Sequence, residues 1–149
     1  MGSGESGARL GCEVGDGVVK CYPKNRVGIR LSPVSPANDA VTSDRNQVFG
    51  YFVSELAKRG IAYIHVIEGS TGGPRDDIAF NFGALRKAFS GAYIANNGYD
   101  RDLAIKDISS GNADLIAFGK AFIANPDLVE RLRLDAPLRT ANSNKVNGG

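Results

Sequence analysis

One histidine, two cysteines and no G-x-S-x-G motif occur in the 149 residues, so the usual carriers of nucleophilic and acid–base chemistry are scarce. A Ser-His-Asp acyl-transfer centre has no support in such a sequence. Cys12 and Cys21 lack metal-ligand spacing and have no histidine nearby. We therefore interpret them as reduced thiols of a cytoplasmic protein, and we predict no metal site.

Strong net charge and long apolar runs are also absent. Lys and Arg number 18 against 16 Asp and Glu, which gives a net charge of +2. This balance, without a basic cluster interleaved with aromatic residues, argues against a nucleic-acid partner. Apolar runs such as residues 113–118 are too short to span a bilayer, and the first residues lack the pattern of a signal peptide. We expect neither a nucleic-acid nor a membrane partner.

The chain does contain a regular alternation of short β-branched segments with amphipathic helical ones. We predict strands over residues 26–32, 61–67, 92–95 and 114–118, each followed by a helix. The first of these helices is capped by Ser43 or Asp44 and ends at Gly60, and the last has Asn125 as its N-cap. Parallel neighbouring strands need such helical crossovers, so the pattern predicts a parallel sheet covered by helices.

The two ends of the chain are less regular. Gly11, Gly15 and Gly17 weaken a helical segment before Pro23, so we expect residues 1–25 to form a leader and an irregular helix. Residues 139–149 are polar and rich in Asn and Gly, and we expect a flexible tail. Between them, 26–138 hold four strand–helix units, which fit a small open α/β sheet or half of a (β/α)8 barrel. A whole barrel needs about 250 residues.

Arg30 is the most informative single residue. Alternation along residues 27–32 places Val27, Ile29 and Leu31 on one face of a strand and Arg30 on the other. A guanidinium near the carboxyl end of a buried parallel strand is either paired, for instance with Glu68, or faces a polar ligand site. We favour the ligand site. His65, in contrast, lies in the middle of a strand, and we expect a packed, hydrogen-bonded side chain.

Two glycine-containing turns follow the last two predicted strands. Asn96, Asn97 and Gly98 come after one strand, and Gly119 and Lys120 come after the next. Backbone N–H groups at such turns, together with a cation and a nearby helix N-terminus, make an anion site. The loops after the seventh and eighth strands are the usual phosphate site of barrels.

Three stretches carry a resemblance to a known family. The segments RVGIRLSP (26–33), YIANNGYD (93–100) and DLIAFGKAFIANPDLVERL (114–132) resemble the Old Yellow Enzymes, which include N-ethylmaleimide and oxophytodienoate reductases. The resemblance covers residues 26–138 and implies an α/β fold, the C-terminal half of a (β/α)8 TIM barrel, with these motifs as its fifth, seventh and eighth strands. It also implies FMN as cofactor, with hydride passing from NAD(P)H to FMN and then to an activated alkene.

The resemblance assigns roles to five residues. Arg30 matches the arginine at the pyrimidine edge of the flavin, where its charge would stabilise the anionic reduced ring. Asn97 and Gly98 match the backbone cradle of the FMN phosphate. Gly119 and Lys120 match the pair that completes the cradle, which is usually Gly-Arg. Lysine keeps the charge of that arginine but lacks its bidentate fork.

The resemblance also implies what this chain lacks. The family's substrate-binding His-His or His-Asn pair and its proton-donating Tyr lie on the first four strands, so we predict no catalytic residue here. We expect a flavin-binding half that is inactive alone and that pairs with a second copy of itself or with a complementary N-terminal half. The alternatives are a non-catalytic α/β scaffold or phosphate- or flavin-binding module derived from the family, and a small flavodoxin-like phosphate binder with an open sheet.

Overall fold

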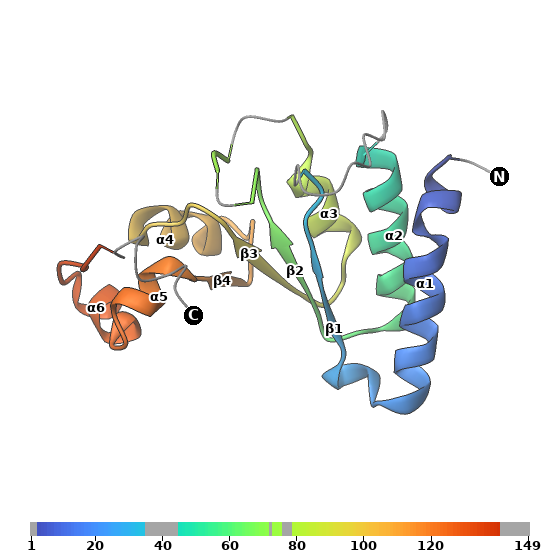
Figure 1. The fold of residues 1–149 in the computed structure, drawn as a ribbon, viewed down its shortest axis with the longest axis horizontal. Helices are drawn as coiled ribbons and strands as arrows, with labels where there is room; N and C mark the ends of the chain where they lie inside the picture. Colours follow the sequence, from blue (N-terminus) through green and yellow to red (C-terminus); the bar gives the residue numbers. More distant parts are fainter. Residues whose placement is uncertain (1–2, 35–44, 72, 76–78, 141–149) are drawn as a thin grey trace, which may run out of the picture.

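The computed structural model describes residues 3–34, 45–71, 73–75 and 79–140 of the chain. Four parallel strands alternate with helices in the predicted order (Figure 1). The strands are β1 (Gly28–Leu31), β2 (Tyr63–Ile67), β3 (Ala92–Asn96) and β4 (Leu115–Ala117). The helices are α1 (Ser3–Cys21), α2 (Arg45–Arg59), α3 (Phe82–Ala88), α4 (Arg101–Ser109), α5 (Lys120–Ala124) and α6 (Leu128–Leu134), with a short 3-10 turn, η1 (Lys24–Arg26). The caps predicted at Ser43 and Asp44 lie outside the described residues.

The sheet has the order β1-β2-β3-β4, and every neighbouring pair is parallel. Its register divides the side chains into two rows on opposite faces, because successive residues of a strand point to opposite sides. The row Ile29, Ile64 and Tyr93 belongs to the hydrophobic core. We call this the helix-covered face, since helices α2 and α3 lie on one side of the sheet (Figure 1) and Ile64 and Tyr93 have 0% of their surface exposed.

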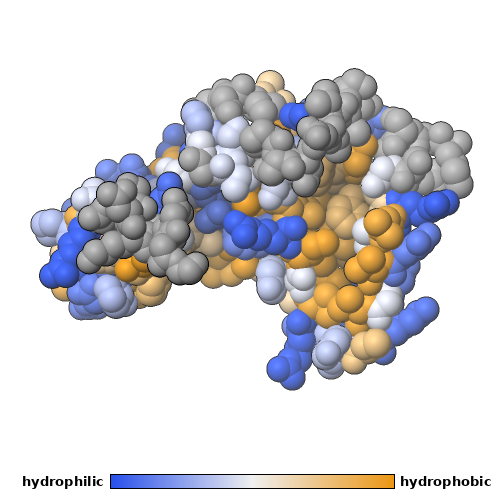
Figure 2. Space-filling view, viewed as in Figure 1, coloured by the Kyte–Doolittle hydropathy of each residue, from blue (hydrophilic) through white to orange (hydrophobic). Residues whose placement is uncertain are grey.

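The opposite row consists of Arg30, His65, Ile94 and Leu115, and we call it the open face. Leu115 is 51% exposed there, and Tyr63, two residues before His65, is 39% exposed. Figure 2 shows that apolar surface is also open to solvent between β1 and helix α1. The sheet is therefore packed on one side only by the described residues.

Helix α1 is more regular than its glycines suggested. It runs without interruption for 19 residues and packs along α2 (Figure 1). A Cβ at Gly11 would lie 2.6 Å from the ring of Phe52 on α2, and one at Gly7 would lie 3.2 Å from Val48. Arg59 of α2 also pairs with Asp16 of α1 at 2.7 Å. The expectation of an irregular helix was wrong because it counted the helix propensity of glycine and missed the close approach that glycine permits.

The end of the chain also differs from the prediction. Asn125 does not cap α6, whose N-cap is Asp127. The Asn125 side chain is buried and bonds both to the Ala121 carbonyl of α5 and to the backbone N–H and carbonyl of Arg139. It thus joins the end of α5 to the segment after α6. Among the described helices, none combines the length and apolarity needed to cross a membrane.

Candidate functional site

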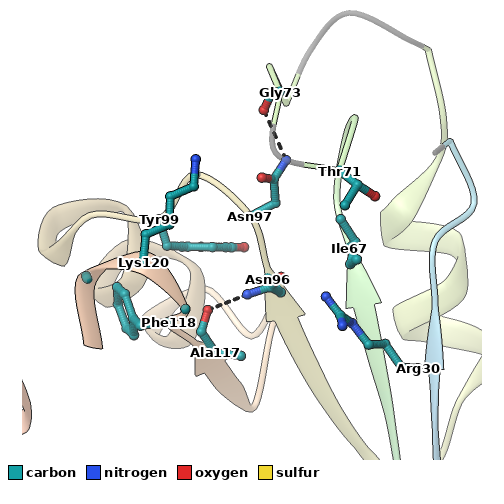
Figure 3. A pocket seen from close by; sticks show the side chains of 13 residues that line it. Arg30, Ile67, Thr71, Gly73, Asn96, Asn97, Tyr99, Ala117, Phe118 and Lys120 are labelled. Atoms are coloured by element: carbon teal, nitrogen blue, oxygen red, sulfur yellow. Dashed lines mark hydrogen bonds between the residues drawn. The ribbon is translucent and has the colours of Figure 1, made fainter. Parts of the chain in front are cut away.

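A pocket of about 440 Å³ lies at the carboxyl ends of the strands, where parallel α/β sheets bind their ligands (Figure 3). Its volume is in the range of pockets that hold small molecules and cofactors. All five predicted site residues line it, namely Arg30, Asn97, Gly98, Gly119 and Lys120. The structure therefore brings together side chains and turns that are up to 90 positions apart in the sequence. Their role in binding stays a prediction.

Arg30 reaches the pocket from β1, and Figure 3 shows its guanidinium directed toward Ile67 and Asn96 at the ends of the next two strands. The alternative of an ion pair with Glu68 is wrong, because Glu68 pairs with Arg75 at 2.6 Å. Among the described residues, Arg30 has no carboxylate within ion-pair distance. Its positive charge is thus available to a ligand.

The turn after β3 has an unusual backbone. Asn97 and Gly98 both have positive φ, 94° and 64°, a conformation that is uncommon outside glycine and that asparagine adopts more often than most other residues. The Asn97 amide side chain turns away from the pocket floor and donates to the carbonyls of Glu68 at 2.8 Å and Ser70 at 3.1 Å, in the loop after β2. The family role implied for Asn97 and Gly98 concerns backbone N–H groups, and this side-chain arrangement is compatible with it.

The second turn leads directly into α5, a helix that was not predicted from the sequence. Gly119 is the N-cap of α5 and Lys120 is its first residue. Figure 3 shows Lys120 and Arg30 on opposite sides of the pocket, with Asn96 and Asn97 between them. Two cations at opposite sides of one pocket suit an elongated ligand with electron-rich groups at both ends.

Sequence reasoning missed a buried polar cluster behind the Asn97 turn, formed by Glu68, Arg75, Tyr93, Tyr99 and Asp107. The Tyr93 hydroxyl donates to Glu68 at 3.0 Å, and the Tyr99 hydroxyl lies 2.9 Å from Glu68 and 2.8 Å from Asp107. Burial raises the pKa of both tyrosines well above the ordinary value, and the charge of Glu68 adds to it. Alternation along β3 indicates that Tyr93 is inside, but nothing local to the sequence indicates its partners.

His65 does not match its prediction either. It is half-buried on the open face, and its Nε2 atom is buried without a hydrogen-bond partner. Burial lowers its pKa, and the charge of Arg30, its register neighbour, lowers it further. The strand pairing places the guanidinium-bearing Arg30 beside His65 instead of a hydrogen-bond acceptor.

Comparison with known proteins places this geometry in a family. The family model of the NADH:flavin oxidoreductase / NADH oxidase proteins matches residues 1–139. The chain belongs to this family. Its fold is shared with morphinone reductase, with a TM-score of 0.88, 37% identity and coverage of 99% of this chain. The old yellow enzyme from Trypanosoma cruzi gives a TM-score of 0.84 at 31% identity over 92% of this chain.

Among curated proteins, the chain is 42% identical over 146 residues to the putative 12-oxophytodienoate reductase 5 of Oryza sativa subsp. japonica. The predicted resemblance to the Old Yellow Enzymes is confirmed, and the family match also includes the first 25 residues, which lay outside the segment 26–138. The chain spans 39% of that reductase and 40% and 36% of the two solved structures. The four parallel strands are therefore part of a (β/α)8 barrel architecture, as predicted, and the open-sheet flavodoxin alternative is not supported.

Proposed function

We propose that this chain forms the flavin-binding part of an FMN-dependent NAD(P)H oxidoreductase of the Old Yellow Enzyme type. One observation carries the proposal: the fold brings Arg30 and the two turns, Asn97–Gly98 and Gly119–Lys120, into a single pocket. The family, whose flavin is FMN, supplies the identity of the ligand. FMN bound there would supply the hydride-transfer chemistry, from NAD(P)H to an activated alkene.

The residues of the pocket fit this cofactor. Gly98 and Gly119 place backbone without side chains on the pocket wall, where N–H groups can approach a phosphate. Lys120 supplies a positive charge beside the two turns, as a phosphate requires. Arg30, on the opposite side, would hold the ring edge and favour its anionic reduced form. The chain thus contributes binding, orientation and electrostatic stabilisation.

Flavin fluorescence tests the binding half of the proposal. Titration of the 149-residue chain with FMN is expected to quench the flavin emission, and Lys120→Ala is expected to weaken FMN binding about tenfold, the value of one charged hydrogen bond. Lys106→Ala, at an exposed position in α4 outside the pocket, is the matched control. Equal FMN affinity in these two variants would contradict the assignment of Lys120.

A second candidate, a flavin- or phosphate-binding module without turnover, is favoured by the position of His65. Its imidazole lies in mid-strand with Nε2 buried, and His65 is not among the residues that line the pocket. General acid or base assistance is typically worth 10²–10⁴-fold in rate. We expect no NADPH-dependent reduction of N-ethylmaleimide by the isolated chain, even with FMN bound. Turnover at a rate normal for an enzyme would show that the chain holds a proton donor of its own.

The open edges of the sheet support a proposal about partners. Within the described residues β1 pairs only with β2, and β4 only with β3, so each outer edge has unpaired backbone groups. A second copy of the chain or a complementary N-terminal half would supply the four strands that close a ring of eight. Light scattering at micromolar concentration tests this, and a stable monomer of 15.7 kDa with cooperative unfolding would contradict it.

We also propose that the protein is cytoplasmic. Cys12 and Cys21 are both free thiols, and Cys21 is exposed, as is usual in a reducing compartment. Fractionation of cells that express a tagged chain tests this location, and recovery outside the cytoplasm would refute it.

A further inference from the structure

The pocket-forming turn Asn97–Gly98 is held from behind by Arg75, a residue of the loop after β2. One guanidinium nitrogen of Arg75, Nη1, donates to the backbone carbonyl of Asn97. The stem of Arg75 passes against Gly98, where a Cβ would lie 3.1 and 3.2 Å from its Cδ and Cγ atoms. Arg75 thus contacts both residues of a turn whose positive φ angles are intrinsically unfavourable for asparagine.

Contact with this carbonyl has a consequence for the next amide. A trans peptide is planar, and its C=O and N–H groups point in opposite directions. The structure has no cis peptide bond among its described residues. When Arg75 fixes the Asn97 carbonyl, it therefore fixes the Gly98 N–H to point away from Arg75. No described residue accepts a hydrogen bond from this N–H, and Gly98 lines the pocket.

Arg75 is itself held firmly. Its Nη2 atom pairs with Glu68 Oε2 at 2.6 Å, and its guanidinium carbon lies 4.2 Å from the centre of the Tyr99 ring. Glu68 is only 8% exposed and also accepts from the hydroxyl of Tyr93, which has no exposed surface. Glu68, Tyr99 and Tyr93 therefore leave the guanidinium little freedom to turn away from Asn97, because hydrogen bonds to a buried carboxylate are strong and directional.

We propose that Arg75 is a positioning residue, which orients the Gly98 amide N–H into the pocket so that it binds the phosphate of the flavin nucleotide. Glu68 and Tyr99 act through Arg75 by fixing its guanidinium. This role rests on the proposed FMN site. It adds that selectivity for the phosphorylated flavin depends on Arg75, a residue that does not line the pocket. Riboflavin, which has the same ring and no phosphate, is the probe that separates this role from a general structural one.

The test compares Arg75→Met with the matched control Arg86→Met. Methionine keeps the apolar stem against Gly98 and removes both the ion pair and the carbonyl contact. Arg86 forms an ion pair with Asp114 at 2.8 Å, similar in geometry but far from the pocket, at the opposite end of the strands. We expect Arg75→Met to weaken FMN binding about tenfold, the value of a lost hydrogen bond from a charged group, and to leave riboflavin binding unchanged. Arg86→Met should change neither affinity.

A second measurement needs no flavin. The backbone ¹⁵N order parameters of Asn97 and Gly98 are expected to fall from about 0.85 to below about 0.6 in Arg75→Met, and to stay unchanged in Arg86→Met. If wild-type chain binds no FMN, the proposed function fails, and these order parameters still decide whether Arg75 orders the turn. Unchanged order parameters, or equal losses of FMN and riboflavin affinity, would overturn the positioning role.

If Arg75→Met does not fold, Glu68→Gln takes its place. This variant keeps the shape of the side chain that holds Arg75 and removes its charge. We expect Glu68→Gln to weaken the binding of FMN more than the binding of riboflavin. An equal effect on the two affinities would overturn the proposal.

Discussion

The helix-covered face and the open face of the sheet are built from the same four strands but differ in what packs on them. Ile64 and Tyr93 point toward the helices and have no exposed surface, whereas Leu115 on the open face is half exposed. Both rows contain apolar side chains, so composition alone does not explain the difference. The open face also carries Arg30 and His65, and its carboxyl end leads into the pocket. The contrast shows that, among the described residues, the chain packs a hydrophobic core on one face of the sheet and leaves the other face exposed.

Large-to-small substitutions on the two faces should give the largest difference in the free energy of unfolding. We expect Ile64→Ala to lower the free energy of unfolding by about 2–5 kcal/mol, because it leaves a cavity in a closed core. In the chain without a partner, Leu115→Ala should change it by less than about 0.5 kcal/mol, as is usual for exposed sites. Urea unfolding of both variants measures this. A loss above about 2 kcal/mol at Leu115 that grows with protein concentration would show that a second copy covers the open face.

Helix α1, which packs along α2, contains two glycines in contrasting environments. Gly11 faces the Phe52 ring, whereas a Cβ at Gly17 would meet nothing within 4 Å. We expect Gly17→Ala to stabilise the protein by about 0.5–1 kcal/mol through helix propensity. Gly11→Ala should be less stable than Gly17→Ala by about 1–3 kcal/mol, the usual cost of overpacking. Thermal unfolding checks both, and equal effects would mean that α1 and α2 are not in close contact.

A substitution in the pocket, at the carboxyl end of the open face, should give a smaller effect. Lys120→Arg restores the Gly-Arg pair usual in the family, and a planar guanidinium can bind a phosphate through two hydrogen bonds. We expect FMN affinity to rise about fivefold and riboflavin affinity to stay the same. Fluorescence titration with both flavins measures the change. An equal gain for riboflavin would indicate that residue 120 contacts the ring system instead of the phosphate.

Much of the fold followed from local patterns. The four strands were predicted because their β-branched residues alternate in short runs between helical periods, and alternation also placed Arg30 opposite Ile29. The five candidate residues were chosen because polar groups at the carboxyl ends of parallel strands meet at one edge of the sheet, and the family resemblance supplied their expected roles. The regularity of α1 was not predicted, because its glycines allow close packing against α2, a helix that is distant in the sequence.

The contacts behind the pocket could not be predicted for a related reason. Asn125 has the composition of an N-cap, but its amide bonds to Arg139, 14 residues away. Arg75 and Glu68 are seven residues apart, and only the fold shows that they meet Tyr99. Such polar clusters depend on three-dimensional packing of several elements, whereas sequence periods report only whether a side chain points inward.

His65 gives the smallest predicted effect and tests the environment of the open face. Burial, together with the neighbouring charge of Arg30, holds its pKa below the ordinary value of about 6.5. The folded protein therefore binds a proton at His65 less tightly than the unfolded chain does. Its neutral form contributes stability that is fully present above about pH 6.5 and is lost as the pH falls through that value toward the lower folded pKa.

We therefore expect the free energy of unfolding of the wild-type chain to fall more steeply between about pH 7 and about pH 5 than that of His65→Gln, which cannot titrate there. Arg30→Met should give an intermediate slope, because burial remains and the repelling charge is gone. Urea titrations at several pH values measure the three slopes. Parallel curves for wild type and His65→Gln would show that His65 is as well solvated in the folded protein as in the unfolded chain. A partner that covers the open face should steepen the wild-type slope, since deeper burial lowers the pKa of His65 further.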